Sequence, residues 1–251
     1  MIEELVKVSI LIITFSIAAA KDWRTREINP SVWIPSLAVG LPLGVIKALN
    51  GLTVYQLLSI IISLVIVSSV AVLVFVFKLM GGADFLAITS FTVVYPYVQY
   101  TPFMYRWNSS MIANLSSVIL VLPPIVAVLI VYTVVMTLFL IYNILHNLKH
   151  MDFLGSLETP LHKKLYIVLF HRIVDVDTIY RKRFYYPILV PGRIERRSFD
   201  VYEDDLIWRE KLSDIPKGTR IVASWGIPMV TFFSISTFIY LILYLLVLLN
   251  R

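Results

Sequence analysis

The chain has 251 residues, of which 59% are hydrophobic and only 15% are charged, and its mean hydropathy of +0.83 is higher than soluble globular domains usually reach. It contains no cysteine, which excludes disulfides, thiol nucleophiles and cysteine-ligated zinc or iron–sulfur sites. The formal net charge of +6 is compatible with nucleic-acid binding, so the basic residues must be placed along the chain before that class is judged.

Six apolar stretches approach the length of about 20 helical residues that a bilayer crossing takes. The first ends at the charged residues Lys21 and Asp22 and lacks a small-residue cleavage site, so we expect a retained span. The second contains Pro42, and we expect it to be kinked. The six predicted spans run approximately over Val6–Ala20, Val32–Leu49, Val54–Phe77, Asp84–Tyr100, Ile112–Leu145 and Ile221–Leu249.

One long polar stretch, residues 146–220, separates the fifth and sixth spans. Apolar and aromatic runs recur in it between charged residues, at lengths typical of strands or short helices, so we expect a small folded soluble insert. The sequence therefore predicts an all-α polytopic membrane protein with six transmembrane helices. Residues 1–145 would hold helices one to five, residues 146–220 the cytoplasmic insert, and residues 221–251 the sixth helix.

The distribution of Lys and Arg predicts the orientation of these spans in the cell membrane. Of the 22 such residues, three lie in the first loop, one in the third and fourteen in the insert, all on the same side. An excess of Lys and Arg marks the cytoplasmic side, so both termini are expected outside. Topology thus accounts for the basic charge, and we expect membrane lipid and no nucleic acid as a partner.

Two aspartates are predicted to lie at the same, cytoplasmic, membrane face. Asp22 ends the first span, and Asp84 begins the fourth after the small residues Gly81, Gly82 and Ala83, which would let the backbone bend and a substrate approach closely. Two neighbouring carboxyl groups can share a proton, so that one activates water while the other protonates a leaving group. This is the chemistry of an aspartyl peptidase, which uses no cofactor.

Spacing alone leaves a structural role open for both aspartates. Asp22 could be the polar end of a span, paired with a neighbouring base such as Lys21, Arg24 or Arg26. Asp84 could be the N-cap of the fourth helix after a glycine turn.

The two aspartates lie in segments that resemble motifs of a known family. Residues 21–28, Lys-Asp-Trp-Arg-Thr-Arg-Glu-Ile, resemble the K/Q-D-x-R/K-x-x-x-I-P/D/N stretch of type IV prepilin peptidases, and residues 81–84, Gly-Gly-Ala-Asp, resemble their G-x-G-D motif. The likeness is closest to the archaeal preflagellin (prearchaellin) and prepilin peptidases. Ala83 stands where the strict motif has glycine, and because alanine is also small we expect activity to be kept.

The resemblance implies an aspartic endopeptidase that removes class III signal peptides from archaellin and type IV pilin-like precursors at the cytoplasmic face. It also implies that Asp22 and Asp84 are the catalytic residues. Bacterial members usually add a cysteine-rich zinc region and methylate the new N-terminus. This chain has no cysteine, so we expect no methyltransferase activity.

Other polar groups in and near the insert admit further interpretations. His146 and His150 have the i, i+4 spacing of zinc ligands, but no glutamate lies between them as in H-E-x-x-H, and a polar helix end is favoured. An acidic cluster could attract the basic leader of a substrate or simply form a solvated face. This cluster consists of Asp200, Glu203, Asp204 and Asp205.

Two other functions are alternatives to the peptidase. A membrane scaffold or assembly subunit of a pilus or secretion system would use the aspartates for contacts between helices. A transporter is disfavoured because the spans show no charged residue at the midplane and no evident inverted repeat. The distance between the two carboxyl groups distinguishes the peptidase from the scaffold, because catalysis requires these groups to come together whereas a scaffold does not.

Overall fold

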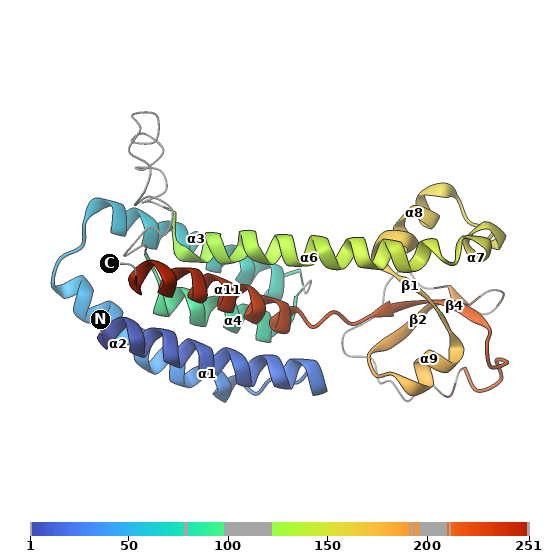
Figure 1. Cartoon of the computed structure of the whole chain (residues 1–251), viewed down its shortest axis with the longest axis horizontal. Coiled ribbons are helices and arrows are strands. Elements are labelled where there is room, and N and C mark those ends of the chain that lie inside the picture. Colours follow the sequence, from blue (N-terminus) through green and yellow to red (C-terminus); the bar gives the residue numbers. More distant parts are fainter. Residues whose placement is uncertain are drawn as a thin grey trace. The chain divides into compact units, whose positions relative to one another are not determined.

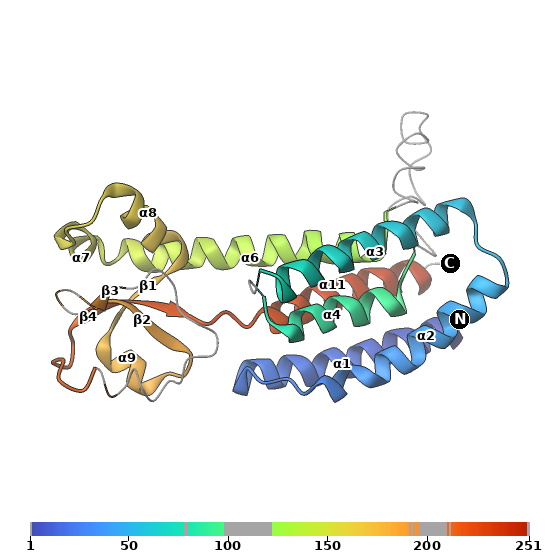
Figure 2. The same cartoon turned by 180° about the vertical axis from the view of Figure 1, so that it is seen from behind.

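The computed structural model describes residues 2–77, 80–97, 122–190, 192, 194–195, 210 and 212–249. These residues form helices and one four-stranded antiparallel sheet, and the chain divides into two compact units (Figures 1 and 2). The first, called the helical unit below, comprises residues 1–135 and 228–251. The second, called the insert unit, comprises residues 136–227. The sheet lies in the insert unit and corrects the expectation of an all-α fold.

Most helices of the helical unit follow the apolar stretches of the sequence. Among the described residues, four helical segments are long and apolar enough to cross a membrane, namely 30–49, 54–75, 124–148 and 229–246, so the chain is an integral membrane protein. The elements of this unit are α1 (Ile2–Thr25), the 3₁₀ helix η1 (Pro30–Trp33), α2 (Ile34–Leu49), α3 (Val54–Phe75), α4 (Gly82–Val94), the first part of α6 (Pro124–Leu148) and α11 (Met229–Leu249).

The first and fourth expected spans fall in α1 and α4, which are not among those four apolar helices. α1 has 24 residues but carries charged side chains near both ends, including Glu4, Lys7 and Asp22. α4 is apolar but has only 13 residues, and it ends at Val94 rather than near Tyr100. The beginning of the expected fifth span, up to residue 121, lies outside the described residues.

α4 is the helix that the others surround, since it contacts α1, η1, α2, α3 and α11. Its Phe91 is fully buried in a core that includes Phe15 and Trp33. Close packing between α2 and α4 depends on Gly40, because a Cβ atom there would lie 3.0 Å from the side chains of Val93 and Val94. This packing sets the place of α4, and therefore of Asp84 at its start.

The insert unit is built on an antiparallel sheet with the strand order β1-β4-β2-β3. Apolar side chains of the sheet contribute to two separate clusters of buried residues. The elements of this unit, after the last turns of α6, are α7 (Met151–Ser156), α8 (Leu161–Phe170), β1 (Arg172–Asp175), α9 (Val176–Arg181), β2 (Tyr185–Val190), β3 (Ile194–Glu195) and β4 (Arg220–Trp225).

Strand β4 corrects the expected start of the sixth transmembrane helix at Ile221. Residues Ile221–Ser224 are buried and pair with β1 on one side and β2 on the other, so this apolar run is a central strand. Short apolar runs fit a buried strand as well as a helix, and here Gly226 and Pro228 interrupt the pattern before α11 begins at Met229.

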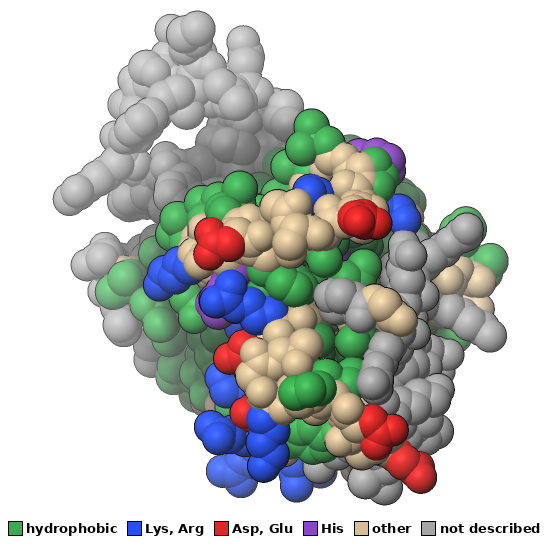
Figure 3. Space-filling model, turned by 90° about the vertical axis from the view of Figure 1, so that its right-hand side faces the viewer, with side chains coloured by type: hydrophobic (Ala, Val, Ile, Leu, Met, Phe, Trp, Pro, Cys, Tyr) green, Lys and Arg blue, Asp and Glu red, His purple; other side chains and the backbone are tan. Residues whose placement is uncertain are grey.

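Within the insert unit, buried polar side chains hold the last turns of α6 against β1 and the residue before it. Asn147 accepts a hydrogen bond from the Ile173 N–H (3.0 Å) and donates to the His171 carbonyl. Asn143 accepts from Arg172 Nε (2.9 Å), whose guanidinium lies 4.9 Å from the Trp225 ring centroid. In Figure 3, which faces the insert unit, Lys and Arg side chains gather toward the lower left.

Candidate active site

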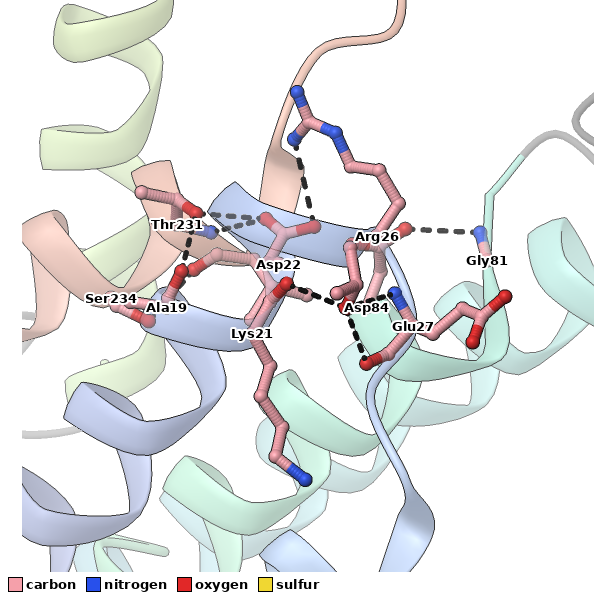
Figure 4. Close-up of polar contacts among 11 residues, drawn as sticks. Ala19, Lys21, Asp22, Arg26, Glu27, Gly81, Asp84, Thr231 and Ser234 are labelled. Carbon is pink, nitrogen blue, oxygen red and sulfur yellow. Dashed lines mark hydrogen bonds and ion pairs between the residues drawn. The ribbon is translucent and has the colours of Figure 1, made fainter. Parts of the chain in front are cut away.

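Asp22 lies at the end of α1, and its side chain is held by residues of two segments (Figure 4). It is only 6% exposed. Its Oδ2 accepts hydrogen bonds from the backbone N–H of Thr231 (2.8 Å) and from the Thr231 hydroxyl (2.9 Å), both at the start of α11. Its Oδ1 lies 3.6 Å from a guanidinium nitrogen of Arg26. The carboxylate is therefore buried, hydrogen-bonded and paired with a cation.

Arg26 reaches Asp22 because of the way α1 ends. The helix stops at Thr25, and Arg26 adopts a left-handed conformation with φ of 61° while its N–H bonds to the Asp22 carbonyl (3.3 Å). A residue other than glycine in the left-handed conformation carries about 1–2 kcal/mol of backbone strain. The turn then continues into η1, where Asn29 Oδ1 accepts from the Ser31 N–H (2.9 Å). This strained conformation of the Arg26 backbone is found where its guanidinium lies beside the Asp22 carboxylate.

Asp84 is held at the opposite kind of helix end, in the first turn of α4. Gly81 is the N-cap residue, and Asp84 Oδ2 accepts a hydrogen bond from the Gly81 N–H (3.0 Å). Asp84 is thus not itself the N-cap, although its carboxylate satisfies one of the free N–H groups at this helix end. The side chain is half-buried.

The structure brings the two predicted aspartates together in the helical unit. α1 contacts α4, and the charge of Asp22 acts on Asp84. Tyr132 of α6 is a third group at this place, because its hydroxyl lies within the electrostatic influence of both carboxylates. Figure 4 shows Asp22 between Thr231 and Asp84. Two carboxyl groups so arranged can hold different protonation states, as acid–base catalysis requires.

The small residues before Asp84 leave room beside it. Gly81 has ordinary extended dihedral angles (φ −79°, ψ 155°), and neither Gly81 nor Gly82 has a positive φ, so the expected bend does not use the conformational freedom of glycine. A Cβ atom at Gly82 would meet nothing within 4 Å. Ala83 packs against the helical core. Close approach of a substrate at these residues stays a prediction.

Thr231 could not be predicted as a site residue, because it lies 209 residues from Asp22 along the chain. No spacing or motif links the two residues, and a single threonine in the first turn of an apolar helix does not by itself indicate a functional site. The acidic cluster Asp200, Glu203, Asp204 and Asp205 lies outside the described residues.

The two histidines of α6 and the segment after it serve local contacts. The His146 ring Nε2 lies 3.1 Å from the Ile173 carbonyl, and its ring packs against that of His150. Within the described ranges no three His, Asp or Glu side chains are grouped as metal ligands would be.

Comparison with known families decides the class of protein. The model of the type IV leader peptidase family matches residues 9–144, which is more than half of the chain and includes both Asp22 and Asp84. The chain belongs to this family. It is therefore an aspartic peptidase, and its membership implies cleavage of prepilin-type signal peptides. A comparison with curated proteins finds no match. The match ends before the insert unit's sheet and α11, so Thr231 lies outside it.

Proposed function

We propose that Asp22 and Asp84 are the catalytic pair of this peptidase and that it removes class III signal peptides from archaellin and type IV pilin-like precursors. The observation that carries the proposal is the placement of two carboxyl groups, one buried and one half-buried, at the ends of two helices that contact each other. Both belong to segments with the likeness to archaeal prepilin and preflagellin peptidases, and both lie within the family match.

The pair would hydrolyse a peptide bond by general acid–base catalysis. The ionised carboxylate takes a proton from a water molecule while the water oxygen bonds to the carbonyl carbon. The protonated carboxyl group gives its proton to the leaving nitrogen when the C–N bond breaks. No covalent intermediate forms on the chain, and we expect no methyltransferase activity.

The placement of the two aspartates also suggests where a substrate is cut. In the proposed topology α1 and α4 complete a set of six spans, the catalytic pair faces the cytoplasm and both termini lie outside. Asp22 then ends an apolar helix and Asp84 begins one, so both lie at the boundary between hydrocarbon and water. A precursor whose basic leader precedes an apolar segment would present its cleavage site at this boundary.

The test is cleavage of a membrane-inserted precursor with a basic leader by the full-length protein, with the new N-terminus identified by mass spectrometry. We expect cleavage directly before the apolar segment and a loss on the order of 10³-fold in Asp22→Asn and Asp84→Asn. A precursor with the leader bases replaced by glutamine serves as the control for substrate class. If both variants insert normally and cleave at the wild-type rate, the aspartates are structural and the scaffold or assembly subunit becomes the better interpretation.

A further inference from the structure

The Asp22 carboxylate lies at the N-terminus of α11. The first N–H groups of a helix have no partner within it, and the helix dipole makes this end favourable for negative charge. Thr231 is in the first turn of α11 and directs both its N–H (2.8 Å) and its hydroxyl (2.9 Å) at Asp22 Oδ2. The same hydroxyl lies 3.2 Å from the Ala19 carbonyl, but its single proton has the shorter contact with the charged Asp22 oxygen. Thr231 thus holds the Asp22 carboxylate through two hydrogen-bond donors.

The surroundings of the two aspartates differ in a way that separates their roles. Asp22 accepts two hydrogen bonds on one oxygen and has the Arg26 guanidinium near the other. Among the described residues, Asp84 accepts one hydrogen bond, from the Gly81 N–H. Donors and a nearby cation stabilise a carboxylate ion more than a neutral carboxyl group. When one proton is shared between the pair, these contacts favour the charge on Asp22 and the proton on Asp84.

We propose that Thr231 is a positioning residue that holds Asp22 ionised, which makes Asp22 the general base and Asp84 the general acid. The inference rests on the proposed function, because it assigns roles within that catalytic pair. Thr231 touches neither water nor peptide in this scheme, and it acts through the Asp22 oxygen that it orients. α11 lies outside the part of the chain that the family model matches, so the assignment comes from the contacts themselves.

The groups around Asp22 define what removal of the Thr231 hydroxyl would do. Among the residues that the structure describes, three titratable or charged side chains act on Asp22 from the packed elements, namely Arg26 after α1, Asp84 of α4 and Tyr132 of α6. α11 contributes the neutral donors of Thr231. Valine has nearly the shape of threonine, so Thr231→Val removes the hydroxyl with its contacts to Asp22 and Ala19 and keeps the backbone N–H bond to Asp22.

The experiment measures kcat/KM for precursor cleavage against pH in membranes for wild type, Thr231→Val, Thr231→Ser and Ser234→Ala. Ser234 is the matched control, because it lies one turn further along α11, is fully buried, and bonds only to its own helix through the Val230 carbonyl (2.7 Å). We expect Thr231→Val to move the acid limb of the profile about one pH unit upward, roughly tenfold in rate on that limb. Thr231→Ser should restore the wild-type limb, and Ser234→Ala should leave it in place.

The outcomes separate this inference from the proposed function. If Thr231→Val lowers the rate equally at every pH, or if serine fails to restore the limb, Thr231 only packs and the positioning role is overturned. An unchanged profile in Thr231→Val overturns it as well. Asp22→Asn is measured in parallel: if that variant still cleaves, the catalytic pair itself is refuted, whatever Thr231 does.

Discussion

α1 carries a buried carboxylate near each of its ends, and the two are held in similar ways. Glu4 is 5% exposed and Asp22 is 6% exposed. Each accepts a hydrogen bond from a hydroxyl group of α11, Glu4 from Tyr244 (2.6 Å) and Asp22 from Thr231 (2.9 Å). These two contacts join the same pair of helices at both ends of the helical unit. Burial and a hydroxyl partner therefore do not by themselves mark a catalytic carboxylate.

The difference between the two ends lies in the other charges present. Glu4 lies 3.4 Å from the ammonium group of Lys7, which is itself only 4% exposed and lies 5.9 Å from the Tyr95 ring centroid. A buried carboxylate with a buried cation is neutralised in place. Asp22 has Arg26 on one side, but a second carboxyl group, Asp84, on the other. Lys7 also pairs with the carboxylate of Glu3, but Glu3 is exposed and lies on the same helix, whereas Asp84 is half-buried and begins a second helix. Under the proposed function, this half-buried second carboxyl group is what separates the catalytic end from the structural end.

Removal of the cation at the structural end should have the largest effect on stability. Lys7→Met leaves the buried Glu4 carboxylate without its closest cation, which should destabilise the helical unit by about 3–5 kcal/mol. Unfolding in detergent, followed by heat or denaturant, measures this loss. Lys47→Met, at an exposed position of α2, is the control and should change stability by less than about 0.5 kcal/mol. Equal effects of the two substitutions would show that Glu4 and Lys7 do not depend on each other.

A bulky residue at Gly40 should disturb the catalytic end through α4. Gly40→Val forces side-chain atoms against Val93 and Val94, which overpacks the α2–α4 contact at a cost of about 1–3 kcal/mol. A shift of α4 moves Asp84 relative to Asp22, and we expect a fall in cleavage rate of about tenfold or more per folded molecule. Gly44→Val is the matched control in the same helix, because a Cβ atom there meets nothing within 4 Å. Cleavage as fast in Gly40→Val as in Gly44→Val would mean that the placement of α4 does not limit catalysis.

Loss of the hydroxyl at the structural end should weaken the fold and leave catalysis alone. Tyr244→Phe removes the hydrogen bond to Glu4, which is worth about 2 kcal/mol for a charged acceptor. Cleavage by the folded fraction should keep its rate and its pH profile. A shifted pH profile in this variant would contradict the division between a structural and a catalytic end.

These comparisons separate what the sequence could predict from what it could not. The two aspartates could be found because each lies at an end of an apolar stretch within a recognisable motif. Thr231 could not be, because its contact with Asp22 exists only after α1 and α11 pack. The start of the last helix was misplaced because Ile221–Trp225 is as apolar as a membrane span, and only its pairing with β1 and β2 makes it a strand. Composition predicts apolar spans, whereas the Thr231–Asp22 contact and strand β4 depend on contacts between segments that are far apart in the sequence.

The smallest expected effect concerns a buried neutral group in the insert unit. Burial lowers the pKa of His171 to about 4 from its ordinary value of 6.5. The unfolded chain therefore binds a proton that the folded unit does not, so stability is full above pH 6.5 and falls as the pH drops toward 4, by about 1 kcal/mol at pH 5.5. Hydrogen exchange of the β1 amides, corrected for the intrinsic pH dependence, measures this change.

Two substitutions test whether His171 causes this change in stability. His171→Phe should remove most of the pH dependence, while His162→Phe, at an exposed site of α8, should keep it. The same slope in all three proteins would show that His171 does not cause the loss.

The central claim is that Asp22 and Asp84 catalyse and that Glu4, which is as buried as Asp22, does not. The most direct test compares cleavage rates per folded molecule in three carboxyl-to-amide variants, Asp22→Asn, Asp84→Asn and Glu4→Gln. We expect losses on the order of 10³-fold in the first two and a rate within about threefold of wild type in Glu4→Gln. Cleavage by either aspartate variant at the wild-type rate, or an equal loss in all three, would contradict the account.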